Sequence, residues 1–177
     1  MHNQAYFDVA LICLLALACI FDMTERRIPN ALLLSGLIAA AVLHLMAGPA
    51  STRAITFFGG FIVGLAIFLP LYMMRAMAAG DVKLMATVGA FTGPALAIEI
   101  CLATYCIGGV LALLMVMVSG RSQAAFANIA CVLRPIFMRM RGIPAVSEPM
   151  LSHSVGGMPY AVAISLGSML VLWLHQG

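Results

Sequence analysis

The chain is a succession of long apolar runs separated by short polar stretches, and this pattern limits the folds open to it. Hydrophobic residues make up 64% of the chain and charged residues 8%, so it cannot form the polar surface of a soluble globule. The runs are continuous rather than alternating, which argues against a membrane β-barrel. We therefore predict an all-α, polytopic membrane protein with about six transmembrane helices, forming a single domain over residues 1–177. The predicted spans are centred on residues 6–21, 31–47, 54–74, 84–91, 95–118 and 158–174.

Proline and glycine mark several of the helix boundaries. The first run is slightly short for a span of roughly 20 residues, so its helix is expected to extend beyond both ends. Pro29 suits the first turn of the second helix. Residues 92–94, Thr-Gly-Pro, predict a turn between a short fourth helix and a fifth. A single kinked helix is the alternative, although roughly 35 residues is too long for one span.

The segment 120–157 is the one long stretch with a more polar character. Arginines alternate in it with apolar residues, a spacing typical of an amphipathic helix that lies on the membrane surface. We predict that it forms a cytoplasmic amphipathic loop. The arginines are Arg121, Arg134, Arg139 and Arg141.

The basic residues predict the orientation, because cytoplasmic loops are enriched in Lys and Arg. If the loop after the first helix is cytoplasmic, only Arg53 of the nine basic residues faces the other side. Six spans then place both termini on the non-cytoplasmic side. The same order of spans places Asp22 and Asp81 at the cytoplasmic face. The cytoplasmic set is Arg26, Arg27, Arg75, Lys83, Arg121, Arg134, Arg139 and Arg141.

Asp22 and Asp81 each lie at the edge of an apolar run, where a charge is costly and commonly functional. Two carboxylates close together cannot both ionise easily, so they share a proton and titrate as a unit. One can then deprotonate a water while the other polarises a peptide carbonyl. This is aspartyl protease chemistry, and it requires no metal or cofactor. The cysteines and histidines show no metal-ligand spacing, and the net charge of +3 gives no reason to expect nucleic acid as a partner.

The same residues also admit structural interpretations. Asp22 could cap a helix or pair with Arg26 at the i+4 position, and Asp81 could cap the fourth helix. Lys83 could extend to lipid headgroups, or steady the carboxylate of Asp81 or of a substrate. Asp8 and Glu99 are expected at the opposite membrane face.

Three stretches together resemble the type IV prepilin leader peptidases, a family of GxGD aspartyl membrane proteases. Asp22 followed by Arg-Ile-Pro-Asn at 27–30 is similar to the family's "D…R.IPN" segment. Gly-Asp-Val-Lys-Leu at 80–84 is similar to its "GxGDxKL" segment, and Met-Pro-Tyr-Ala-Val-Ala at 158–163 to its "(I/V)PY..A" segment. With the six-helix pattern, the resemblance covers essentially the whole chain.

The resemblance implies that Asp22 and Asp81 are the catalytic pair, with Ala78, Gly80, Lys83, Arg27 and Asn30 supporting the site. It implies cleavage of a short basic leader from prepilin or pseudopilin precursors in the bacterial inner membrane. The paired CxxC motifs of the larger, methylating members are missing. The chain is therefore similar to the short Flp/Tad-type branch, and we expect peptidase activity without methylation.

One departure from the family pattern leaves other functions open. Ala78 stands where GxGD has its first glycine, and alanine disfavours a positive φ. An inactive membrane component of a pilus or secretion system is therefore an alternative, and archaeal preflagellin peptidases are also similar. A small proton-coupled transporter would instead need its carboxylates near the bilayer midplane.

Overall fold

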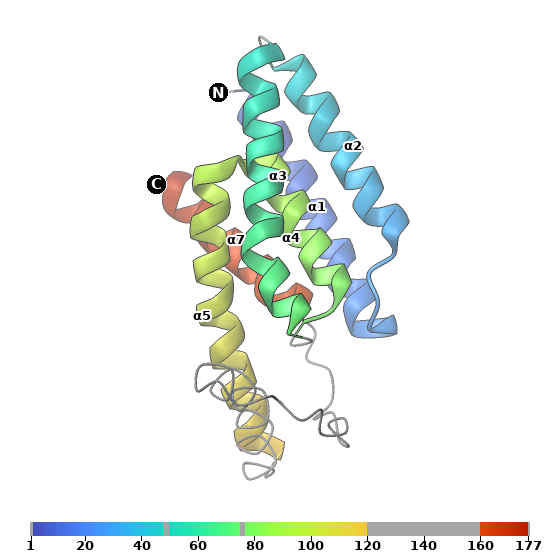
Figure 1. Ribbon diagram of the computed structural model, residues 1–177, viewed down its shortest axis with the longest axis vertical. Coiled ribbons are helices and arrows are strands. Elements are labelled where there is room, and N and C mark those ends of the chain that lie inside the picture. The colour runs from blue at the N-terminus through green and yellow to red at the C-terminus, as the bar shows by residue number, and fades with distance from the viewer. Residues whose placement is uncertain (1, 48–49, 75–76, 120–159, 177) are drawn as a thin grey trace, which may run out of the picture. The chain divides into compact units, whose positions relative to one another are not determined.

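The computed structural model is all-helical, as the sequence predicts, over the residues that it describes: 2–47, 50–74, 77–119 and 160–176. The chain divides into two compact units, residues 1–109 with 159–177, and residues 110–158. The candidate site and the core lie in the first unit. Its helices, drawn in Figure 1, are α1 (His2–Glu25), α2 (Asn30–Met46), α3 (Ala50–Met73), α4 (Ala79–Thr92), the first part of α5 (Pro94–Ser119) and α7 (Tyr160–Gln176).

Several predicted boundaries are confirmed. The first helix extends beyond its apolar run at both ends, and residues 84–118 form two helices rather than one kinked helix. Three helices are long and apolar enough to cross a membrane, over Ala5–Glu25, Arg53–Met73 and Pro94–Val118. The predicted amphipathic segment 120–157 lies outside the described residues.

The turn between α4 and α5 depends on Gly93 and Pro94. Gly93 has φ 82°, in the left-handed region that glycine adopts without strain, and its N–H donates to the Gly89 carbonyl. A Cβ at Gly93 would also lie 2.7 Å from Thr56 Cγ2. Pro94 begins α5, where a missing N–H costs nothing.

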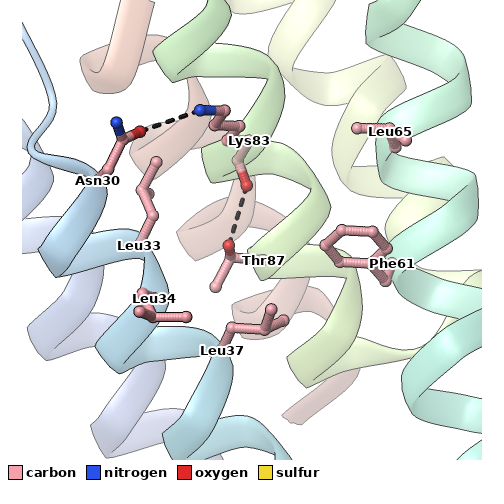
Figure 2. A pocket seen from close by; sticks show the side chains of 8 residues that line it. All are labelled: Asn30, Leu33, Leu34, Leu37, Phe61, Leu65, Lys83 and Thr87. Atoms are coloured by element: carbon pink, nitrogen blue, oxygen red, sulfur yellow. Dashed lines mark hydrogen bonds between the residues drawn. The ribbon is translucent and has the colours of Figure 1, made fainter.

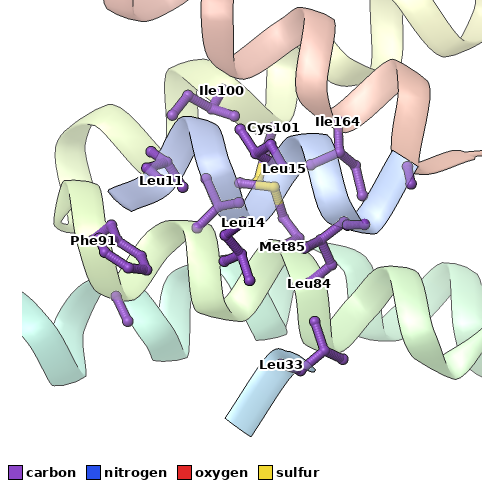
Figure 3. Close-up of a cluster of buried hydrophobic side chains, with 14 of the residues drawn as sticks. Leu11, Leu14, Leu15, Leu33, Leu84, Met85, Phe91, Ile100, Cys101 and Ile164 are labelled. Carbon is purple, nitrogen blue, oxygen red and sulfur yellow. The ribbon is translucent and has the colours of Figure 1, made fainter. Parts of the chain in front are cut away.

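Helix α4 lies in the middle of the core. It contacts α1, α2, α3 and α7, and ten of its 14 residues are buried. Leu84 and Met85 of α4 meet Leu11, Leu14 and Leu15 of α1 in the cluster shown in Figure 3. At 1.5 Å per residue, α4 is roughly 21 Å long, shorter than the hydrocarbon core of a bilayer.

Helices α3 and α4 touch through their backbones. A Cβ built on Gly60 would collide with the Gly89 carbonyl, and one on Gly89 would collide with the Gly60 carbonyl. A Cβ on Gly64 would approach the Met85 carbonyl oxygen to 2.5 Å. Small residues at such an interface let two helix backbones approach closely. Gly60 and Gly64 therefore let α3 pack closely against α4.

His44 of α2 completes the hydrogen bonding of α4. Its Nε2 donates to the Ala90 carbonyl at 2.9 Å. That carbonyl would normally accept from the residue four positions later, which is Pro94 and has no N–H. His44 is buried and packs edge-on against Phe7 and Phe57. It is a structural histidine that ties α2 to the end of α4.

The helix directions bring several chain segments to one end of this unit. Helices α1 and α3 end there, and α2, α4 and α7 begin there (Figure 1). The opposite end holds the α4–α5 turn and the contact between His175 and Glu99, at 3.5 Å.

The backbone contact predicts very different tolerance at two neighbouring glycines. Gly60→Ala should lower the free energy of unfolding by about 3 kcal/mol or more, because α3 and α4 must separate. Gly59→Ala is the matched control: its Cβ would lie 3.6 Å from Pro94, an ordinary contact, and alanine favours the helix. Thermal unfolding of the detergent-solubilised variants compares the two, and equal stability would contradict the backbone contact.

Candidate active site

Asp22 lies in the last turn of α1 and joins α1 to α7. It is 9% exposed, and its Oδ2 accepts a hydrogen bond from the Ala161 backbone N–H at 3.0 Å. Ala161 belongs to the first turn of α7, whose N–H groups have no partner within the helix. A carboxylate is a favourable partner there, because the helix dipole is positive at this end. Asp22 thus caps α7 from another helix.

Asp81 is the third residue of α4 and is 7% exposed. Its carboxylate accepts a hydrogen bond from the backbone of Ala78, the N-cap residue. An acidic side chain that reaches back from this position to the N-cap N–H is one half of a capping box. The N-cap residue is therefore Ala78, and Asp81 lies in the first turn of the helix.

The two aspartates lie on helices that contact each other, Asp22 on α1 and Asp81 on α4. The Asp22 carboxylate lies within electrostatic range of Asp81, and Asp81 lies within electrostatic range of Tyr160, the first residue of α7. All three helices contact one another. Two carboxylates in a shared, mostly buried position can hold one proton between them. Such a pair can activate a water molecule for attack on a carbonyl carbon.

The described residues contain no group of three or more His, Cys, Asp or Glu side chains that could hold a metal ion.

The turn before α4 accommodates alanine without strain. Ala78 has φ −77° and ψ 151°, an extended conformation that any residue adopts. The positive φ that would have required glycine is therefore not used at this position. Gly80 lies next to Ile28. A Cβ added at Gly80 would lie 3.5 Å from Ile28 Cβ, an ordinary contact.

The other predicted supporting residues lie on a different side of α4. Lys83 Nζ donates to Asn30 Oδ1 at 3.0 Å (Figure 2). Residues two apart on a helix point in nearly opposite directions, so Lys83 faces α2 while Asp81 faces α1 and α7. Arg27 is exposed in the segment between α1 and α2. The structure thus joins Asn30 to Lys83 but does not bring this pair onto the aspartates.

The alternative ion pair of Asp22 with Arg26 does not form in the part of the chain that the structure describes. Arg26 ends α1 in a left-handed conformation, with φ 53°, and is exposed. Glu99, expected near the opposite face, lies beside His175 at the other end of the unit from Asp22.

Sequence reasoning about candidate residues overlooked the start of α7. Ala161 donates its N–H to Asp22, and Tyr160 lies within electrostatic range of Asp81. One turn away on α1, Cys19 Sγ lies 3.0 Å from Ser165 Oγ and 3.5 Å from the Ala161 carbonyl. The signal for this region was the Pro-Tyr-Ala match at 159–161, which was used only as a mark of resemblance.

Comparison with known families agrees with the resemblance. The sequence model described as "Type IV leader peptidase family" matches residues 9–113, more than half of the chain. The matched range contains both aspartates. No curated protein and no solved structure matches the chain significantly.

The bond from Ala161 to Asp22 predicts a difference between two substitutions. Asp22→Ala should lower the free energy of unfolding by about 0.5–2 kcal/mol, the usual cost of losing a helix cap. Asp22→Asn should keep most of the stability, because its amide oxygen still accepts the N–H. Thermal unfolding in detergent measures both, and an equal loss in the two variants would contradict the capping role.

Proposed function

Because the chain belongs to the type IV leader peptidase family, we propose that it is an aspartyl endopeptidase that removes the basic leader peptide from type IV, Flp-type prepilin precursors. The observation that supports the proposal is that Asp22 and Asp81, one from each of the two sequence motifs, are both buried and lie within electrostatic range of each other.

In the proposed reaction, one aspartate accepts a proton from water and the other, protonated, donates a hydrogen bond to the scissile carbonyl. The water oxygen forms a bond to the carbonyl carbon, and the C–N bond then breaks as a proton passes to the leaving amine. The aspartate that takes the proton from water returns it to the leaving amine, so the pair ends the turnover in its starting protonation state. Tyr160 lies within electrostatic range of Asp81.

The proposed orientation places the aspartate end at the cytoplasmic face of a bacterial inner membrane. Arg26, Arg27 and Lys83 all belong to segments at that end, whereas Arg53, bonded to the Ala47 carbonyl at 3.0 Å, belongs to the other. The positive-inside rule supports this orientation. With six membrane-embedded helices, both termini then lie outside, and a leader that has stayed in the cytoplasm meets the aspartates directly.

Two alternatives have less support. An inactive pilus or secretion component was suggested by Ala78 alone, and the extended conformation of Ala78 removes the conformational reason for it. A proton-coupled transporter would place its carboxylates near the middle of the helices, whereas Asp22 and Asp81 lie in terminal turns.

Conservative substitution of either aspartate tests the proposal. Co-expression with an Flp-type prepilin precursor should give a shortened product on a gel. Asp22→Asn and Asp81→Asn should each slow processing by roughly 10²–10⁴-fold, the range for loss of general acid–base catalysis. Asp8→Asn should process normally, because Asp8 is fourteen residues, roughly 21 Å, along α1 from Asp22. Normal processing by a folded Asp22→Asn or Asp81→Asn variant would refute the pair.

Restoring the family's glycine tests the turn before α4. Ala78→Gly should change the processing rate by less than about twofold, since Ala78 already adopts an unstrained conformation. The initial rate of leader removal by purified enzyme is the measurement. A tenfold or larger gain would mean that the working enzyme needs a positive φ at this position.

A further inference from the structure

A groove between α2, α3 and α4 lies on the opposite side of α4 from the aspartates. Its volume is about 380 Å³. Figure 2 shows the side chains that line it. Its walls are leucines of α2, namely Leu33, Leu34 and Leu37, and Phe61 and Leu65 of α3. Asn30 and Lys83 stand together at one end of it. The groove is therefore apolar along its length and cationic at one end.

The Lys83 ammonium group, at one end of the groove, has more N–H donors than Asn30 can accept from. Lys83 Nζ has three N–H donors, of which Asn30 Oδ1 accepts one at 3.0 Å. Among the described residues, no carboxylate forms an ion pair with Lys83. Thr87, the remaining polar wall residue, donates its hydroxyl proton to the Lys83 carbonyl at 2.9 Å. An anion at this end would meet an ammonium group that no acidic side chain of the described residues neutralises.

We propose that this groove binds one anionic phospholipid, with its phosphate at Lys83 and Asn30 and an acyl chain along the leucines. An apolar wall at membrane depth suits a hydrocarbon chain, and basic pockets between membrane helices suit anionic headgroups. A flexible acyl chain can lie along this open apolar groove, and the lipid phosphate supplies a negative charge beside Lys83.

The bound lipid would brace the helix that carries Asp81. Lys83 and Asp81 are two residues apart on α4, one facing the groove and the other facing Asp22. A phosphate shared by Lys83 and Asn30 holds the start of α4 against the start of α2. The proposal concerns lipid binding alone, so it stands or falls independently of peptidase activity.

Native mass spectrometry of the purified full-length protein tests the proposal directly. Delipidated protein incubated with phosphatidylglycerol should retain one lipid, and phosphatidylcholine at the same concentration should be retained several-fold less. Lys83→Gln should weaken phosphatidylglycerol retention about fivefold, the contribution of one basic group at an anionic surface. Lys83→Arg should restore it, and Arg53→Gln should leave it unchanged. Equal retention of the two lipids, or no effect of Lys83→Gln, would overturn the proposal.

A second pair of variants tests the position of the acyl chain. Leu34 lines the groove and is 59% exposed, so Leu34→Trp can cover the groove without disturbing the core. Ile38→Trp is the matched control, because Ile38 is similarly exposed on α2 but does not line the groove. Leu34→Trp should lower phosphatidylglycerol retention and Ile38→Trp should not. Equal effects would overturn the proposal, as would displacement of the lipid by an apolar helical peptide of neutral charge.

Discussion

The backbone contact between α3 and α4 is the constraint on which the rest of the first unit depends. Gly60 and Gly89 let the two helices approach until no Cβ can fit between them. In a membrane, apolar helices gain little from leaving lipid for one another, so close packing of this kind is the main attraction between them. It holds α4 inside the unit, where its leucine, valine and methionine side chains complete the core.

Burial of α4 has consequences at both of its ends. At the C-terminal end, Pro94 leaves the Ala90 carbonyl without a partner in the helix, and the buried His44 donates to it. At the N-terminal end, Asp81 is held against α1 and α7, beside Asp22. Backbone groups inside a membrane protein must find partners within the protein, because lipid offers none. His44 of a neighbouring helix serves the C-terminal end of α4, and Asp81 of α4 itself serves its N-terminal end.

The N-terminus of α7 holds Asp22, a residue with both a structural role and a proposed catalytic role. Asp22 accepts the Ala161 N–H, which ties the end of α1 to the start of α7 and fixes one carboxylate oxygen. The same turn of α7 carries Tyr160 past Asp81. Removing the charge of Asp22 while keeping an acceptor separates the structural role of this residue from its proposed catalytic role. Asparagine at position 22 keeps an oxygen acceptor without the charge, whereas alanine removes both.

The amino-acid order by itself determined the all-helical class, the α4–α5 turn at Gly93 and the two aspartates as the residues to examine. These follow from local properties: apolar run length, the conformations open to glycine and proline, and the cost of a charge beside an apolar run. Only the tertiary structure decided what each residue faces. It turned Lys83 toward Asn30 rather than Asp81, brought Ala161 to Asp22 across 139 positions of sequence, and gave Ala78 an extended conformation. Such contacts depend on how helices distant in sequence pack and rotate against one another, and no local pattern specifies that.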